Sequence, residues 1–366
     1  MTGICVADVG DGLCLAISTV RGPIVQIDCG SQDGSEVAFA GLTRVYGGSL
    51  GAVGPDAFVL SHFHVDHYNG LLYASADPAI DLAIREVYYP RLPEFRRKQD
   101  FLLALFTMNY LVFGNETGLM EYDFLRAIAK MNRVPFVHRP VSRGSVMHLN
   151  GSRYEVLWPP QVLDEGRTLS IMGKALDAFD QALEEDDTTR RLYDRVQHEG
   201  RFWDYIEEVQ GEREPEPTST EQDDRGHERG DLPLVVKRAN EALRRAANHL
   251  SLAFFDSGSL LFLGDTESSE IRQIVSDLKS KHRRHFFTLI PAHHGTHWHK
   301  TLEQIRSVYS VSSVGKRLCS KMHPGLKAIA ENPLATWVCG DICLPVLSCA
   351  RLWHRMPWWT PTIPGP

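Results

Sequence analysis

Short apolar runs separated by Gly and Asp open the chain. The runs are GICVADVG at 3–10, LCLAIST at 13–19 and PIVQIDCG at 23–30. Runs of this length that end at turn-forming residues are typical of strands, so we expect an antiparallel meander. A further apolar run, DAFVLSH at 56–62, predicts a buried strand that ends in a cluster of His and Asp.

The apolar spacing then changes from that of strands to that of helices. Apolar residues recur every three or four positions between about 92 and 132, and a second helical stretch runs from Gly166 to about Val209. Strand-like pieces occur at 146–149 and 152–160. Residues 211–231 contain almost no large apolar side chain, which predicts a mobile loop or a disordered insertion.

The second half of the chain mixes both patterns. A helix, a strand, a turn at 256–259 and a second strand lead to Gly264 and Asp265, and a basic helix and another strand follow. We expect an α+β catalytic domain over 1–345, with a helical insertion at about 92–132 and a helical segment plus acidic linker at about 166–231. Residues 346–366 are rich in Trp and Pro and predict an extended tail.

Composition narrows the classes of partner and compartment. The net charge of -7 excludes a global basic field, so a nucleic-acid substrate would need a local basic patch. Seven cysteines without a CxxC pair favour a reducing compartment. The N-terminus lacks signal-peptide features, and the longest apolar run, 101–114, is shorter than the roughly 20 residues of a membrane span. We therefore expect a cytoplasmic protein without a membrane anchor.

The segment SHFHVDHYNG at 61–70 carries the strongest chemical signal. His62 and His64 lie on one side of an extended segment, so both can reach one metal ion. Asp66 and His67 follow where the chain turns, and they can supply a second ion. So many nitrogen and carboxylate donors within six residues are rarely required by a structural role.

Further donors stand at the ends of later strands. His249 directly precedes the strand LSLAFF, and Asp265 ends the strand LLFLGD, so a hairpin would bring them together. Asp265 is the candidate bridging ligand. His293 is the favoured ligand of the pair that follows TLIPA, with His294 as a catalytic or second-shell donor.

These motifs together resemble those of the metallo-β-lactamase superfamily. IDCG, SHFHVDHYNG, NHLS, FLGDT and PAHHGTH follow one another in the order of its ligand motifs. The resemblance implies a four-layer αββα sandwich with helical insertions. It also implies that Asp28 of IDCG is a second-shell residue that fixes a ligand imidazole, and that Asp66 can orient the attacking hydroxide.

Other segments are similar to the metallo-β-lactamase domain of competence-type DNA-uptake channel proteins. They include VADVGDGLCLAI, YEVLWPP, SVSSVGKRLCSKMHP and WVCGDI. The chain departs from that subfamily, which has Asp where His64 stands and Asn-rich sequence where His249 stands. This resemblance implies that His323, in KMHPG, contacts a substrate phosphate or protonates the leaving group.

Two divalent ions in such a site would lower the pKa of a bridging water and stabilise charge on the attacked centre. The His and carboxylate donors suit zinc, with manganese as an alternative. The leading hypothesis is a phosphodiesterase or nuclease acting on nucleic acid or nucleotides, supported by basic residues at 279–285 and by Arg244 and Arg245.

Two other functions remain open from the sequence. The same site can hydrolyse a small ester, thioester or lactone, with the helical insertion as a lid over an apolar pocket. A non-catalytic metal-binding regulatory module is the third hypothesis. The apolar surplus at 101–114 predicts either that lid or a contact in a homodimer or with another protein partner.

Overall fold

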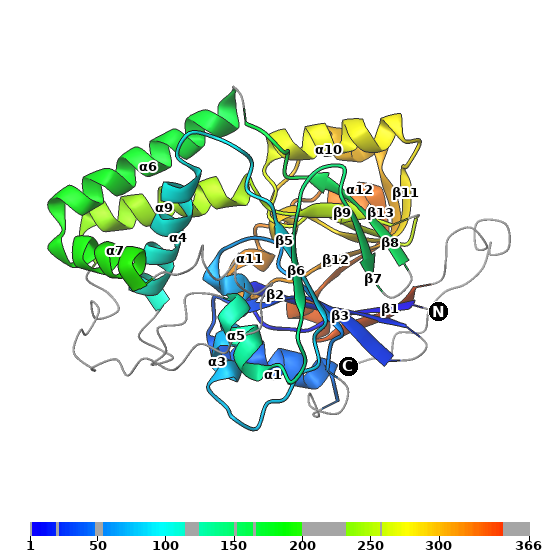
Figure 1. Cartoon of the computed structure of the whole chain (residues 1–366). Helices are drawn as coiled ribbons and strands as arrows, with labels where there is room; N and C mark the ends of the chain where they lie inside the picture. Colours follow the sequence, from blue (N-terminus) through cyan, green and yellow to red (C-terminus); the bar gives the residue numbers. More distant parts are fainter. Residues whose placement is uncertain are drawn as a thin grey trace, which may run out of the picture.

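The structure is a computed structural model. It describes residues 2–19, 22–47, 54–113, 124–149, 152–163, 166–199, 232–256 and 258–346. The acidic linker at 211–231 lies outside the described residues, as does all of the tail beyond Val346. The helices and strands form two packed sheets flanked by helices (Figure 1).

The first sheet is built from both ends of the chain. Its seven strands follow the order β14-β1-β2-β3-β4-β5-β6, antiparallel from β14 to β3 and parallel from β3 to β6. The meander predicted from the opening runs is therefore confirmed as β1 to β3. The bounds are β14 Ile342–Val346, β1 Thr2–Val6, β2 Gly12–Thr19, β3 Gly22–Ser31, β4 Ala57–Val59, β5 Glu86–Pro90 and β6 Val137–Val141.

The second sheet has the same plan. Its order is β13-β12-β11-β10-β9-β8-β7, antiparallel from β7 to β10 and parallel from β10 to β13. Parallel strands place their carboxyl ends at one edge of a sheet. The bounds are β13 Ala330–Ala335, β12 Arg306–Ser312, β11 His285–Ile290, β10 Leu260–Phe262, β9 Ala253–Phe255, β8 Ser152–Trp158 and β7 Val146–Leu149.

Three hydrophobic clusters define the layers. Alternating side chains of both sheets, such as Ile27 and Phe262, meet in the cluster between the sheets. A second cluster packs α10 (Ser268–Ser280) against the outer face of the second sheet. Helices α1 (Ser35–Val45), α3 (Asn69–Ser75) and α5 (Phe124–Met131) share the third cluster with the outer face of the first sheet. The chain thus has the expected α+β, four-layer αββα architecture.

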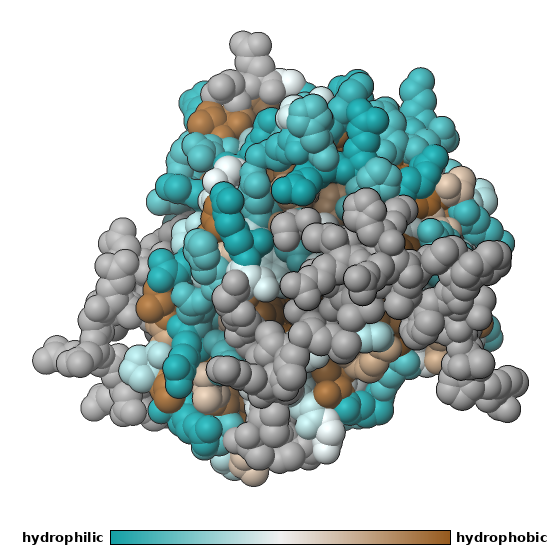
Figure 2. All heavy atoms as spheres, turned by 90° about the vertical axis from the view of Figure 1, so that its right-hand side faces the viewer, coloured by the Kyte–Doolittle hydropathy of each residue, from teal (hydrophilic) through white to brown (hydrophobic). Residues whose placement is uncertain are grey.

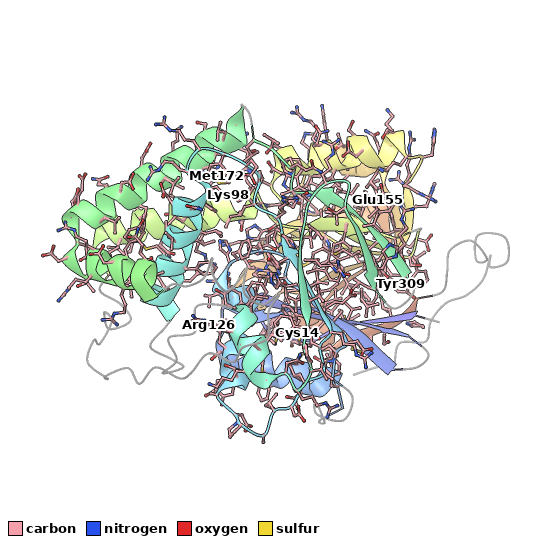
Figure 3. The ribbon with its side chains drawn as sticks, in the orientation of Figure 1. Cys14, Lys98, Arg126, Glu155, Met172 and Tyr309 are labelled. Atoms are coloured by element: carbon pink, nitrogen blue, oxygen red, sulfur yellow. A yellow bond between two sulfur atoms is a disulfide. The ribbon has the colours of Figure 1, made fainter. Side chains whose placement is uncertain are left out.

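Four longer helices form a group beside the sandwich (Figure 1). Met172 and Lys98 mark this group in Figure 3, whereas Glu155 and Tyr309 lie on the strands of the second sheet. The four helices of this group contact one another through apolar faces. The helices are α4 (Lys98–Phe113), α6 (Arg167–Glu185), α7 (Asp187–Glu199) and α9 (Leu234–Asn248).

The sequence predicts exposed apolar side chains in the run at 101–114, but most of the described ones in α4 are buried. Phe101, Leu105 and Phe106 are at most 1% exposed, and the run packs inside the cluster that α4 shares with its neighbouring helices. A helix that is apolar all round is usually surrounded by protein. The expectation of a free apolar face for a lid or a dimer contact is therefore wrong for these residues.

Short helices complete the described elements. Figure 2 shows that hydrophilic side chains predominate on the described part of one face, with hydrophobic ones scattered among them. No helix among the described residues is both long and apolar enough to cross a membrane. The short helices are η1 (Val65–His67), η2 (Ala292–Gly295), η3 (Lys300–Gln304), α11 (Lys316–Cys319), α12 (Leu326–Ile329) and α13 (Thr336–Cys339).

Two of the six cysteines among the described residues are paired. Cys5 of β1 and Cys343 of β14 are partners in the antiparallel register and form a disulfide. The two residues are 338 positions apart, so the sequence spacing did not indicate this pair and only the sheet brings them together. Cys14, Cys29, Cys319 and Cys339 are free. The cytoplasmic location stays a prediction.

Candidate metal centre

The loop that follows β4 holds four potential ligands in the protein interior. His62, His64, Asp66 and His67 are at most 4% exposed. Gly30, at the end of β3, allows this loop to pack closely, because a Cβ there would collide with the backbone carbonyl of Asp66. Helix α4 supports the loop from the other side, where Asn109 Nδ2 donates a hydrogen bond of 2.8 Å to the Phe63 carbonyl.

His62 and His64 converge through their ring nitrogens. His62 Nε2 lies 2.8 Å from His64 Nδ1, and the other nitrogen of His64, Nε2, has no hydrogen-bond partner among the described residues. Burial lowers the pKa of His62 well below its usual value and that of His64 to about 3. Both rings are therefore neutral at physiological pH, which is the state that binds a metal ion.

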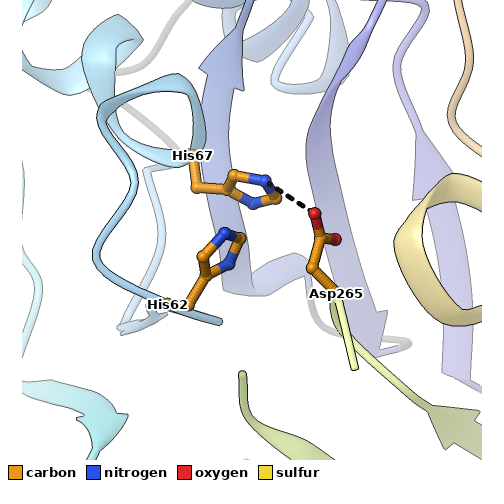
Figure 4. A group of neighbouring side chains, drawn as sticks. All are labelled: His62, His67 and Asp265. Atoms are coloured by element: carbon orange, nitrogen blue, oxygen red, sulfur yellow. Dashed lines mark ion pairs between the residues drawn. The ribbon is translucent and has the colours of Figure 1, made fainter. Parts of the chain in front are cut away.

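Asp265 lies at the centre of the other donors. Its Oδ2 is 3.7 Å from His67 Nε2, 3.7 Å from His294 Nε2 and 3.9 Å from His293 Nε2. The donor atoms of His62, His67 and Asp265 all lie within 4.8 Å of one another (Figure 4). Metal–ligand bonds of about 2 Å put two ligands of one tetrahedral ion roughly 3.4 Å apart, so this spacing is close to that of a coordination shell.

The charges of the cluster support one another. Burial acts to raise the pKa of Asp265, but the nearby His294, His293 and His67 outweigh it and hold that pKa below its usual value. Burial acts to lower the pKa of His67, yet Asp28 and Asp265 raise it to about 9. Asp265 is therefore ionised in the metal-free protein and His67 is protonated, so metal binding by His67 would release a proton.

Asp28 fixes the orientation of His67. Its Oδ2 lies 2.8 Å from His67 Nδ1, and its Oδ1 accepts a hydrogen bond of 2.7 Å from the backbone N–H of Ser61. With Nδ1 held by the carboxylate, His67 presents Nε2 to Asp265. This carboxylate–imidazole contact is the arrangement that fixes the ring of a metal-binding histidine.

We expect Asp28→Asn to weaken metal binding by roughly 10- to 100-fold, because the amide cannot replace the carboxylate as a charged acceptor for His67. Competition with a chromogenic chelator measures this affinity. Asp56→Asn, at an exposed carboxylate before β4, is the control and should match the wild type. Equal affinities for Asp28→Asn and the wild type would show that Asp28 does not position a ligand.

The two histidines after β11 lie in a left-handed turn. His293 has φ 47° and His294 has φ 58°, and a third left-handed residue of the site is Asp28 with φ 52°. Non-glycine residues rarely adopt this conformation, and they tend to occur at functional sites. The turn directs both imidazoles toward Asp265, with the side chain of His294 4% exposed and that of His293 25% exposed. Both therefore remain candidates for ligation.

A second group of donors adjoins His293. Glu267 and His297 bring their donor atoms within 4.8 Å of His293 and of each other, and the His293 and His297 rings are 4.1 Å apart. The sequence analysis did not select these two residues. The motif PAHHGTH contains His297 four positions after His293, and this spacing was the available signal.

The structure does not bring His249 to the same cluster. Its Nδ1 lies 3.0 Å from Glu270 Oε1, and the preceding residue, Asn248, lines the pocket instead. Asn248 Nδ2 lies 3.4 Å from His293 Nδ1, and Asn248 Oδ1 has no partner among the described residues. Ligation by His249 stays a prediction, and Asn248 is a pocket residue that sequence reasoning missed.

The backbone N–H of His323 donates a hydrogen bond of 2.9 Å to the carbonyl of Gly295, next to His294, but the His323 ring makes other contacts. Its ring stacks on Trp298 at 4.7 Å with an interplanar angle of 8°, and its Nδ1 accepts a hydrogen bond from the Gly325 N–H. It is not among the described residues that line the pocket. Its role as an acid or a phosphate contact stays a prediction.

A pocket of about 490 Å³ opens onto the donors. Helix α9 forms one wall, and the two carboxylates Asp66 and Asp265 lie in the lining. All the described lining residues are polar or charged: Gln32, His64, Asp66, Asn240, Glu241, Arg244, Arg245, Asn248, Asp265, Glu267, His293 and His297. The basic segment at 279–285 lies elsewhere, because it precedes or begins β11 whereas His293 follows the end of that strand.

The donor set fits divalent cations. The neutral imidazoles of His62 and His64 and the ionised carboxylates of Asp66 and Asp265 provide ligand atoms and negative charge, and Asp66 Oδ1 and His64 Nε2 have no hydrogen-bond partner among the described residues. The imidazole and carboxylate donors match the ligands that zinc takes in catalytic sites.

Among solved structures, the chain is similar to the metallo-β-lactamase fold protein YhfI from Bacillus subtilis, with 9% identity and a TM-score of 0.40 over 94% of this chain and 99% of that one. It is also similar to MEM-A1, a subclass B3 metallo-β-lactamase isolated from a soil metagenome library. That match has 18% identity and a TM-score of 0.26 over 45% of this chain and 56% of that one. Neither a family model nor a curated protein sequence matches the chain.

Proposed function

We propose that this protein is a metal-dependent hydrolase that binds two divalent cations, most favourably zinc, and cleaves phosphodiester bonds of nucleic acid or nucleotides. The observation that carries the proposal is the placement of Asp265 Oδ2 within 3.9 Å of three imidazole nitrogens at a polar pocket. Bound divalent cations would activate a water molecule and polarise the bond to be cleaved.

Several side chains of the cluster would bind the two cations. His62 Nε2 lies 2.8 Å from His64 Nδ1, and the donor atoms of His62, His67 and Asp265 lie within 4.8 Å of one another. Asp265 lies beside His67 and the histidines after β11, which suits a carboxylate shared between two ions. Asp28 keeps His67 in the required orientation.

The pocket offers two guanidinium groups to an anionic substrate, and bound divalent cations would offset its four carboxylates, Asp66, Glu241, Asp265 and Glu267. Arg244 and Arg245 line it from α9, and no apolar side chain stands among its described lining residues. Guanidinium groups bind phosphate oxygens through paired hydrogen bonds. A small apolar ester or lactone would lack the hydrophobic lining that usually encloses such ligands. The similarity of several segments to competence-type domains supports a phosphodiester in particular.

Activity on a phosphodiester is expected only with metal present. The test is a hydrolysis panel of linear DNA, RNA, cyclic nucleotides, lactones and thioesters on zinc-loaded and manganese-loaded protein. Removal of the metal with excess chelator should abolish turnover, and added zinc or manganese should restore it. Full activity in excess chelator would overturn the proposal, and turnover of lactones or thioesters alone would replace the substrate class.

A further inference from the structure

Arg244 forms an ion pair with a residue of the proposed metal site. Its Nη2 lies 3.0 Å from Asp66 Oδ2, although the two residues are 178 positions apart in the chain. The Asp66 side chain is 3% exposed, whereas that of Arg244 is 31% exposed and lines the pocket. The long side chain of Arg244 thus connects helix α9 to the loop that carries Asp66.

In the proposed metal site the same carboxylate would be a metal ligand. In the described structure, the guanidinium of Arg244 pairs with this buried carboxylate at 3.0 Å. A divalent cation at Asp66 would supply positive charge itself and would repel the guanidinium, since like charges a few ångströms apart destabilise each other. Metal binding and the Arg244–Asp66 pair thus compete.

The pocket offers Arg244 another place. The cavity of about 490 Å³ adjoins its side chain, and Arg245 and Asn240 of the same helix also line it. A released guanidinium keeps five N–H donors in a planar fork, which pairs with the oxygens of phosphate or carboxylate. The buried carboxylate of Asp66 is costly to leave without a positive partner. Arg244 can therefore leave it only when another positive charge, such as a metal ion, takes its place.

We propose that Arg244 exchanges partners: it neutralises Asp66 in the metal-free protein and binds an anionic group of the substrate once metal occupies Asp66. This inference rests on the proposed function, because it assumes metal at Asp66. It makes Arg244 a specificity-determining residue for anionic substrates and makes the anion site dependent on metal occupancy.

The first test is zinc binding without turnover, measured by chelator competition on the wild type, Arg244→Ala and Arg244→Gln. Removing the competing cation should tighten binding of the weaker zinc ion by roughly 10-fold, the scale of one lost charge-assisted hydrogen bond. Arg238→Ala, at an exposed arginine of α9 outside the pocket lining, is the matched control and should bind like the wild type. Unchanged or weaker zinc binding in both Arg244 variants would overturn the exchange.

The second test is anion binding to the zinc-loaded proteins by calorimetry, with inorganic phosphate and acetate as probes. Arg244→Ala should weaken phosphate binding by roughly 10- to 100-fold, and Arg244→Lys should recover part of it, because lysine keeps the charge but not the fork. A larger loss with acetate than with phosphate would assign the site to carboxylates. Equal phosphate affinity in Arg244→Ala and the wild type would overturn the inference alone, whereas a wild type that binds no zinc would overturn the proposed function as well.

Discussion

Replacing Asp265 with alanine is expected to lower turnover by at least about 100-fold and to release metal. The carboxylate lies within 3.9 Å of three imidazole nitrogens, so its removal takes away the charged donor that these histidines share. Loss of a residue that only orients a ligand already costs roughly 10- to 100-fold, and loss of a direct, shared ligand should cost more. Turnover of the best phosphodiester and the metal content per chain measure the effect.

A matched carboxylate separates this effect from a general change of charge. Asp81 forms an ion pair with Arg133 in which both side chains are 52% exposed, so Asp81→Asn should keep full activity and metal content. Asp265→Asn tests the charge with little change in volume and should resemble Asp265→Ala. Wild-type metal content in both Asp265 variants would remove this residue from the ligand set.

The sequence predicts the parts of the site that are encoded locally. His62 to His67 lie within six residues shortly after the buried strand β4, so their proximity follows from the sequence, but the expected extended alternation is wrong because the chain bends at His62 and Phe63 and forms η1. Asp265 ends an apolar strand, and the parallel pairing of β10 with β11 brings it beside the turn that carries His293. Residues that follow two neighbouring parallel strands lie at the same edge of the sheet, so their proximity can be inferred from the sequence.

Which of two adjacent residues points into the pocket is harder to predict from the sequence than which segments lie close together. Asn248 and His249 adjoin the end of α9, where one step along the chain rotates the side chain by about 100°, and the structure turns Asn248 to the pocket and His249 to Glu270. The left-handed turn at His293 and His294 has the same effect, because backbone angles of this kind are not encoded by apolar spacing. Sequence reasoning placed these segments but not the side-chain directions.

The partners of distant segments were not predictable from spacing either. Cys5 and Cys343 meet only because β14 closes the edge of the first sheet beside β1. The apolar run of α4 was interpreted as a free surface because its neighbours α6, α7 and α9 come later in the chain. In both cases the missing information is tertiary pairing.

The same helix leads to the second large expected effect, which is on stability. Phe106 of α4 is 1% exposed and packs on Phe63 of the metal-binding loop, with ring centroids 6.3 Å apart. Phe106→Ala removes a large buried ring and leaves a cavity, so the free energy of unfolding should fall by about 3–5 kcal/mol. Urea denaturation followed by circular dichroism measures this change.

A control on the same helix decides whether α4 is an essential part of the core. Leu103 is only partly buried, so Leu103→Ala removes fewer contacts and should cost clearly less than Phe106→Ala. Because Phe106 contacts Phe63 between His62 and His64, its loss should also loosen the ligands and weaken zinc binding in protein that remains folded. A cost below about 0.5 kcal/mol for Phe106→Ala, within the range of surface substitutions, would show that α4 is a separable appendage rather than support for the metal-binding loop.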